Sequence, residues 1–211
     1  VADQGYDVFL VEKEEQPGGY LRNILLGFEG ENPDALLRET VRRVSSHPRV
    51  TLMTGAELEE VSGYIGNFTS RVKIPGGEQE IRHGVIIVAT GAKPWRPDDY
   101  LYGEDPRVVT QEKLEKTLAA GLPGPDALRE VVMIQCVGSR EDRHPWCSRV
   151  CCSAAIRNAL ALKDAAPQAR VVILYRDIRT FGFREDTLYR RARERGILFV
   201  RFDKDRPPRV V

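Results

Sequence analysis

The chain has 211 residues, enough for one large domain or two small ones with a buried core. It contains 32 Lys and Arg and 31 Asp and Glu, and the positive and negative residues are interspersed along the sequence. This balance gives no strong field to attract nucleic acid, and no apolar run reaches the ~20 residues that span a bilayer. We expect a cytoplasmic protein without a membrane span that binds no nucleic acid.

Apolar runs of strand length alternate with amphipathic patterns of helix length, which predicts an α/β fold. The first half of the sequence predicts a helix at 35–46, strands at 8–12, 50–53, 58–62 and 67–74, and a buried central strand at 85–89. The second half predicts strands at 131–135, 171–175 and 198–202, and helices at 110–120, from Cys147 or Ser148 to 164, and at 185–195.

These elements predict two Rossmann-like units with three-layer parallel sheets, the first of which carries a small antiparallel β layer. The expected divisions are a partial dinucleotide-binding domain at 1–102, a linker with a helix at 103–128, and a truncated second unit at 129–211. The chain opens on the end of a helix, VADQG, and has no Gly-rich turn before its first strand. We therefore expect a fragment that lacks the G-x-G-x-x-G fingerprint.

Three short segments of the first half suggest a nucleotide site. Glu12 ends the first strand, where Rossmann sites place an acid that binds ribose hydroxyls. Pro17-Gly18-Gly19 follows it, and Thr90-Gly91 closes the predicted central strand. Each alone also fits an ordinary reading: an acid in solvent, a plain turn, and the exit of a strand into a loop.

The order of these segments resembles the flavin-binding domain of flavoproteins of the thioredoxin reductase type. The similar parts are a strand ending in VEKE, then PGG, a helix, a β layer and a strand ending in ATGA. The resemblance implies that FAD is contacted by Glu12, Lys13, Gly19, Thr90 and Gly91. It also implies that the second unit occupies the place of the nicotinamide domain.

All four cysteines lie between positions 136 and 152, in the spacing C-x10-C-x3-C-C. On a helix Cys147 and Cys151 would share one face, and thiols in a first turn are favoured as thiolates. Four thiolates at one point suit a cubane iron–sulfur cluster or a tetrahedral zinc ion. A redox-active dithiol and buried structural cysteines remain alternatives, and the single glycine in this loop argues against NAD(P)H binding.

Longer stretches closely resemble the A subunit of heterodisulfide reductase, an iron–sulfur flavoprotein family. They are EEVSGYIGNF at 59–68, LYGEDPRVVTQ at 101–111, and the segment from VVMIQCVGSRED through the cysteines to VVILYRDIRTFG. The resemblance implies that one 4Fe–4S cluster is held by Cys136, Cys147, Cys151 and Cys152. The inserted ferredoxin-like modules that some family members carry between the positions of Gly19 and Val85 are absent from this sequence.

The resemblance implies an oxidoreductase that relays electrons between FAD and the cluster. Its implied partners are other subunits of a heterodisulfide reductase complex and a donor linked to a hydrogenase or dehydrogenase. Two other functions remain open: an NAD(P)H-dependent dithiol enzyme like thioredoxin reductase, and a zinc-stabilised module without activity. No catalytic residue is predicted, and we expect the isolated fragment to be inactive.

Overall fold

The computed structural model describes residues 1–27, 30–122, 124 and 128–211. They form two compact units, a first unit of Val1–Asn23 with Pro33–Lys93 and a second unit of Ile24–Asn32 with Pro94–Val211. Each unit has its own sheets and its own buried cluster. The expected domains at 1–102, 103–128 and 129–211 stay a prediction, and positions 123 and 125–127 lie outside the described residues.

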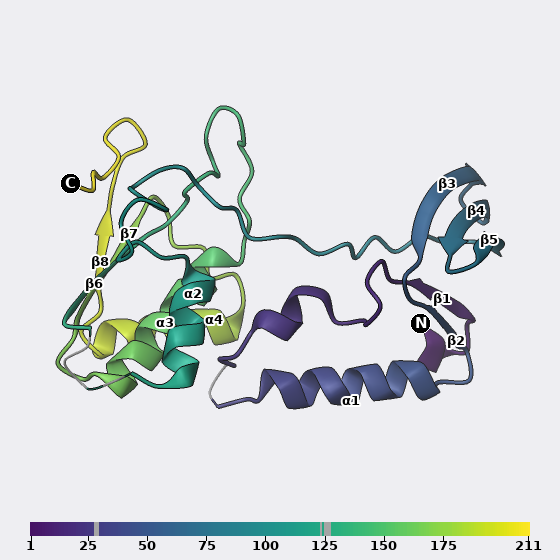
Figure 1. Ribbon diagram of the computed structural model, residues 1–211, viewed down its shortest axis with the longest axis horizontal. Helices are drawn as coiled ribbons and strands as arrows, with labels where there is room; N and C mark the ends of the chain where they lie inside the picture. Colours follow the sequence, from purple (N-terminus) through teal and green to yellow (C-terminus); the bar gives the residue numbers. More distant parts are fainter. Residues whose placement is uncertain (28–29, 123, 125–127) are drawn as a thin grey trace. The chain divides into compact units, whose positions relative to one another are not determined.

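The first unit combines a parallel strand pair with an antiparallel sheet (Figure 1). Its elements are η1 (Ala2–Gln4), β1 (Val8–Val11), η2 (Gly19–Asn23), α1 (Pro33–Ser46), β2 (Val50–Met53), β3 (Glu57–Tyr64), β4 (Asn67–Ile74) and β5 (Gly77–His83). Strands β1 and β2 pair in parallel, and β3, β4 and β5 form an antiparallel meander. The predicted antiparallel layer is thus confirmed, with β5 as a strand that the sequence pattern missed.

The predicted central strand at 85–89 is wrong. Residues 85–97 have no regular structure, and Val85, Ile87 and Val88 are 71%, 71% and 78% exposed. A strand forms when its backbone N–H and C=O groups pair with a neighbouring strand. None of the sheets in the described part of the chain includes this run, so its apolar side chains stay in solvent.

The second unit is built on a three-stranded parallel sheet. Its elements are α2 (Gln111–Ala120), β6 (Glu130–Ile134), α3 (Cys151–Ala165), β7 (Arg170–Tyr175), α4 (Phe183–Glu194) and β8 (Leu198–Arg201). The strand order is β6-β7-β8, and helices α2, α3 and α4 pack next to one another beside the sheet (Figure 1). This strand–helix alternation is typical of half of a doubly wound fold, so the predicted α/β class is confirmed.

One face of this sheet forms the core of the second unit. Val171 and Ile173 from β7 are buried against Ile156 and Leu162 from α3. The other face carries apolar side chains that are partly open to solvent, namely Val132, Leu198 and Val200. The helices therefore supply the hydrophobic burial that holds the β6-β7-β8 sheet in place.

Polar contacts fix the position of α2 against α3. Thr110 caps α2 by accepting a hydrogen bond from the Lys113 amide at 3.2 Å, as expected for a helix that begins after position 110. Asn158 of α3 is fully buried, and its Nδ2 donates to the backbone oxygen and to Oε1 of Gln111 at 3.1 and 2.8 Å. A buried amide bound in this way locks two helices in one register.

Helix α3 begins at Cys151, later than the predicted start at Cys147 or Ser148. Ser148 is a good capping residue by type, but its hydroxyl donates to Cys151 Sγ at 3.3 Å. Arg149 then takes a positive φ of 64°, which interrupts the helix. Cys147 therefore lies in the loop, and the prediction that it shares a helix face with Cys151 is wrong.

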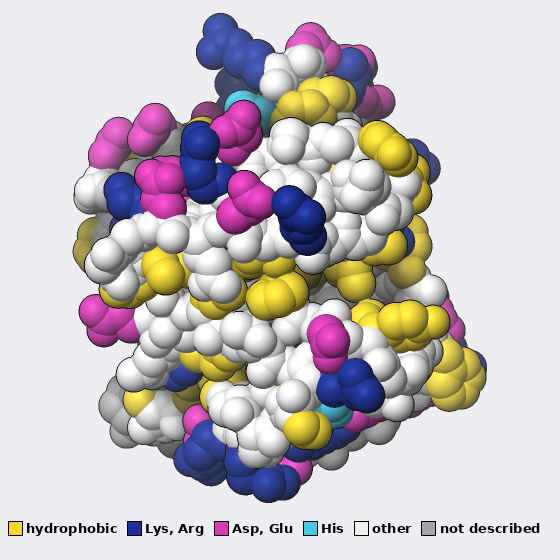
Figure 2. Space-filling model, turned by 90° about the vertical axis from the view of Figure 1, so that its right-hand side faces the viewer, with side chains coloured by type: hydrophobic (Ala, Val, Ile, Leu, Met, Phe, Trp, Pro, Cys, Tyr) yellow, Lys and Arg dark blue, Asp and Glu magenta, His cyan; other side chains and the backbone are white. Residues whose placement is uncertain are grey.

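The surface matches the balanced composition of the chain. Figure 2 shows Lys and Arg mixed with Asp and Glu, and hydrophobic side chains between them. Among the described residues, no helix is both long enough and apolar enough to pass through a bilayer.

Candidate functional site

The cysteines surround the carboxyl end of β6, the first strand of the parallel sheet. Cys136 follows the strand by two residues, is buried, and takes a positive φ of 65°. Cys151 and Cys152 are the first two residues of α3, and Cys147 lies in the loop before them. All four are free thiols. Ligands in open α/β sheets bind at this edge, so the loop is in the expected place for a cofactor site.

Three of the four thiols interact with one another. A hydrogen bond with Cys152, together with the Ser148 hydroxyl and the amides at the start of α3, lowers the pKa of Cys151 to about 6. The same bond raises the pKa of Cys152, with burial adding to the effect. Burial and the nearby Cys151 raise the pKa of Cys136. Cys136, Cys151 and Cys152 thus form one electrostatically coupled group.

Cys147 stands apart from this group. Its Sγ accepts a hydrogen bond from the Arg149 amide at 3.3 Å, within the loop. Across the residues that the structure describes, no three Cys, His, Asp or Glu side chains converge closely enough to hold a metal ion. The four predicted cysteine ligands therefore lie in one region of the structure, but their side chains do not converge on one point.

Arg176 holds the cysteine loop from the neighbouring strand. It follows β7, and its Nη1 donates to the Arg140 backbone oxygen at 2.6 Å. Its Nη2 donates to the backbone oxygens of Cys136 and Ser139, both at 3.4 Å. Its side chain is 14% exposed. The guanidinium therefore binds three carbonyls of the loop, of which the Cys136 oxygen also accepts from the Ser139 amide at 3.3 Å.

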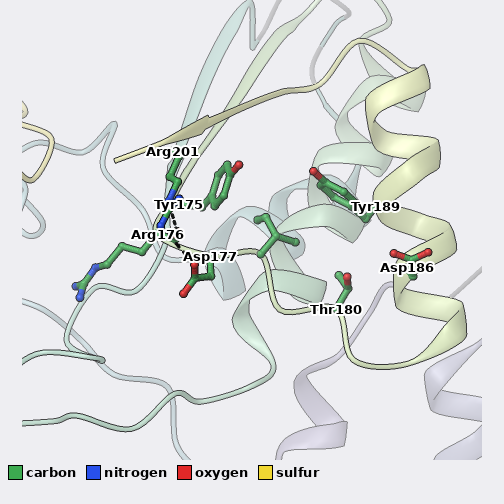
Figure 3. Close-up of a pocket in the computed structure, with 8 residues that line it drawn as sticks. Tyr175, Arg176, Asp177, Thr180, Asp186, Tyr189 and Arg201 are labelled. Carbon is green, nitrogen blue, oxygen red and sulfur yellow. Dashed lines mark hydrogen bonds and ion pairs between the residues drawn. The ribbon is translucent and has the colours of Figure 1, made fainter. Parts of the chain in front are cut away.

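Asp177 contacts two sides of the same loop. Its Oδ2 accepts from Arg140 Nη2 at 2.6 Å, and its backbone oxygen accepts from the Cys152 thiol at 3.8 Å. A hollow of about 370 Å³ lies beside it, and in Figure 3 Arg176 and Asp177 lie at one end of that hollow, with Tyr189 and Asp186 of α4 at the other. The end of β7 thus links the cysteine loop to the first turn of α3.

An aromatic group covers the loop from the segment that precedes α2. The Trp95 indole lies against Gly138, whose φ is +65° and whose position leaves no room for a Cβ. His144 lies between two tryptophans, with ring centroids 5.8 Å from Trp95 and 6.0 Å from Trp146. Trp95 and Trp146 stay 58% and 66% exposed, so the rings cover one side of the loop only in part.

The predicted flavin contacts all lie in the first unit. Glu12 is half-buried at the carboxyl end of β1, and its Oε1 accepts from the Glu14 amide at 3.0 Å. Lys13 is exposed and pairs with Glu57, which raises the pKa of the lysine through a side-chain hydrogen bond at 3.0 Å. The Glu12 carboxylate keeps free acceptor positions, because an ionised carboxylate offers about four.

The glycines of the predicted flavin site differ in their roles. Gly19 and Gly91 have φ of +48° and +66°, and the space where a Cβ would sit is open at both. Gly18 instead lies tightly against the Leu37 side chain of α1, so it serves packing in this structure. Thr90 is exposed and lies outside any strand. The structure therefore places Gly19, Thr90 and Gly91 on open backbone.

Sequence reasoning missed Arg140, Arg176 and Asp177. A signal was present, because Arg176-Asp177 follows a predicted parallel strand directly. The carboxyl ends of adjacent parallel strands meet at one sheet edge, so charged residues there face the cysteine loop.

Comparison with known proteins finds A subunits of heterodisulfide reductases among the relatives. No family model matches the chain. The A-type iron-sulfur subunit of CoB–CoM heterodisulfide reductase from Methanocaldococcus jannaschii is 28% identical over 95% of the chain and 45% of that protein. The A subunit of the H2/formate:CoB-CoM heterodisulfide,ferredoxin reductase from Methanococcus maripaludis is 26% identical over 95% of the chain and 44% of that protein. The chain is similar in sequence to heterodisulfide reductase A subunits over nearly its whole length.

These A-subunit relatives are longer than this chain, which spans less than half the length of each of the two. Their alignments run over 293 positions, more than the 211 residues present here, so the relatives contain inserted segments without a counterpart. A solved structure of bacillithiol disulfide reductase from Bacillus cereus is 18% identical over 95% of the chain and 62% of that protein, with a TM-score of 0.48.

Proposed function

We propose that this chain is part of a flavin-dependent and iron–sulfur-dependent oxidoreductase subunit of the heterodisulfide reductase A type. The observation that carries the proposal is the set of four free cysteines at the carboxyl end of β6 and the start of α3. The relative from Methanocaldococcus jannaschii is named an iron-sulfur subunit, and its alignment covers 95% of the chain. Electron relay between FAD and a 4Fe–4S cluster is the function that suits these residues best.

The donor set fits an iron–sulfur cluster. Thiolates are the soft ligands that iron–sulfur clusters require, and four of them complete one cluster. Cys136, Cys151 and Cys152 already interact, so binding would need these three side chains to converge further and Cys147 to come in from its loop. Arg176 would hold the loop backbone while Cys147 moves, since it binds the carbonyls of Cys136 and Ser139. The cluster, when bound, supplies one-electron transfer.

The flavin would bind to the first unit. Glu12 would accept from ribose hydroxyls at the end of β1, and Lys13 would lie beside it. The open positions at Gly19 and Gly91 leave room for a bulky ligand to approach the backbone, and Thr90 lies next to the second of them. The FAD, when bound, supplies two-electron chemistry that the protein side chains lack.

The relatives also suggest partners for the whole protein. The relative from Methanococcus maripaludis is named for H2, formate, heterodisulfide and ferredoxin. We propose that the protein works with other heterodisulfide-reductase-type subunits and a hydrogenase- or dehydrogenase-linked donor, in the cytoplasm.

The test is cofactor analysis of single Cys→Ala variants in the full-length protein, purified without oxygen. Each substitution at Cys136, Cys147, Cys151 or Cys152 is expected to remove about four irons and four sulfides per chain. The FAD content should stay at its wild-type level, because the flavin residues lie in the other unit. Four variants that keep all their iron would refute the cluster. One zinc without sulfide would instead support a structural metal module.

A dithiol function is favoured by one specific observation. Cys151 and Cys152 are adjacent and hydrogen-bonded, and the pKa of Cys151 is lowered to about 6, as in reactive thiols. In a thioredoxin-reductase-like enzyme, only Cys151→Ala and Cys152→Ala would abolish disulfide reduction. Cys136→Ala and Cys147→Ala would leave it intact, and iron would be absent from the wild type.

A further inference from the structure

Arg140 has a hydrogen-bond donor that the loop does not use. It lies four residues after Cys136, its side chain is 21% exposed, and its Nη2 donates to Asp177 at 2.6 Å. Its Nη1 is buried and has no hydrogen-bond partner in the part of the chain that the structure describes. A buried N–H without an acceptor is costly and rare in folded proteins, so such a group calls for an explanation.

The guanidinium of Arg140 lies beside Cys136 and is tied to Asp177, whose backbone oxygen binds the Cys152 thiol. It interacts with Cys136, and this contact partly offsets the burial that raises the pKa of that thiol. Asp177 anchors the other side of the guanidinium and, through its backbone, the Cys152 thiol. The arginine therefore lies among the groups that would ligate the cluster, with one donor to spare.

Arg176 is less suited to the same role, although its Nε is also buried without a hydrogen-bond partner among the described residues. Both of its terminal nitrogens are bound to backbone carbonyls of the loop. Removing it would release those carbonyls and disturb the loop itself. The Arg140 side chain instead donates to the side chain of Asp177. It can therefore act on the thiols without holding the loop backbone in place.

The surroundings of the thiols carry an excess of positive charge. Four arginines form ion pairs with two acidic residues here: Arg140, Arg179 and Arg201 with Asp177, and Arg176 with Glu141. A cluster with four thiolates is negatively charged and gains a further negative charge on reduction. Positive charge and hydrogen bonds to the sulfurs therefore favour its reduced form.

We propose that Arg140 raises the reduction potential of the cluster by donating from Nη1 to its sulfur atoms, while Asp177 holds the guanidinium in place. This inference rests on the proposed iron–sulfur function. It goes beyond that function because it assigns the tuning of the potential to one side chain that binds no iron. The residue acts by charge and hydrogen bonding, with no bond made or broken.

The experiment is an EPR-monitored redox titration of the full-length protein, purified without oxygen, together with iron and sulfide analysis. Arg140→Gln is expected to keep about four irons, and its cluster should be at least tenfold more oxidised at a given ambient potential, a shift of about 59 mV for a one-electron couple. Arg143→Gln is the matched control, because it removes the same charge from an exposed position of the same loop. Its potential should match that of the wild type, since solvent and salt screen an exposed charge.

The outcomes separate this inference from the proposed function. Full iron with an unchanged potential in Arg140→Gln overturns the role of Arg140 and leaves the cluster standing. A wild-type protein without iron overturns both. If Arg140→Gln loses its iron, Arg140→Lys decides, because it keeps the positive charge but cannot donate from the position of Nη1. A lower potential with full iron then supports the inference, and an unchanged or higher potential, or loss of the iron, overturns it.

Discussion

Gly138 shows how a single residue shapes the cysteine loop. Its φ of +65° is unfavourable for any residue with a Cβ, and the Trp95 indole occupies the space that a Cβ would need. The glycine thereby lets an aromatic ring approach the loop backbone two residues after Cys136. The packing of Trp95 on the loop and the turn of the backbone thus depend on the same position.

Gly138→Ala should lower the free energy of unfolding more than Gly196→Ala does. Both glycines have positive φ, which costs an alanine about 1–2 kcal/mol, but the space around Gly196 is open. The clash with Trp95 should add roughly 1–3 kcal/mol at Gly138. Denaturant titrations of the two variants measure the difference.

A double-mutant cycle identifies the source of the added cost. In a Trp95→Ala background, Gly138→Ala should cost no more than Gly196→Ala, because the clashing ring is gone. If the added cost survives the loss of Trp95, the packing described for this pair is not its cause.

At the scale of elements, α2 anchors an irregular segment of the second unit. Glu115 is 5% exposed, and its Oε1 accepts from the amides of Leu25 and Leu26 at 2.7 and 2.9 Å. One carboxylate on a helix therefore fixes the backbone of a segment far away in sequence. Two charge-assisted hydrogen bonds to one oxygen make this a strong local anchor.

Glu115→Ala should raise the hydrogen-exchange rates of the Leu25 and Leu26 amides by roughly ten- to a hundredfold. Losing a hydrogen bond to a charged group costs about 1.5–3 kcal/mol, and each 1.4 kcal/mol is tenfold. Glu112→Ala is the control on the same helix, because its partner is Lys116 at 2.6 Å, in a pair worth about 0.3–0.5 kcal/mol. Equal exchange rates in the two variants would show that Glu115 does not hold the segment.

The elements that the sequence predicts well are those whose pattern is set locally. The strand at 50–53 has the expected bounds, and the helix expected at 110–120 begins one residue later because Thr110 caps it. Strand β5 was missed, since Ile81 is its one buried side chain and the rest of GEQEIRH is polar. The run at 85–89 looked like a buried strand, but strand formation depends on a neighbour that a local pattern does not show.

The candidate site was predictable in part for the same reason. The grouping of four thiols is visible in the spacing from Cys136 to Cys152. The start of α3 was not, because the Ser148 hydroxyl binds a thiol instead of capping the helix. The bonds from Arg176 to the loop carbonyls depend on how two strand ends meet in space, and no linear pattern specifies those atoms.

Across the whole molecule, hydrophobic burial is uneven between the two units. In the described residues, the buried cluster of the first unit is Met53, Ala56, Val72 and Ile81. The second unit buries a larger cluster drawn from α2, α3, α4 and the β6-β7-β8 sheet. Since apolar burial contributes about 25 cal/mol per Å², the second unit holds most of the hydrophobic stabilisation.

The exposed run from Val85 to Val88 has a consequence for the behaviour of this chain in solution. Val85, Ile86, Ile87 and Val88 carry no charge, favour β structure and present unpaired backbone, which is the signature of segments that stack into cross-β fibrils. We expect the 211-residue chain to self-associate as its concentration rises, with light scattering and thioflavin T fluorescence increasing together. Ile87→Lys should suppress both signals, because stacked strands would bring like charges together. Ile65→Lys, at an 85% exposed position in the turn between β3 and β4, should leave both signals as they are, and an equal effect of the two substitutions would rule out the 85–88 run as the origin of the assemblies.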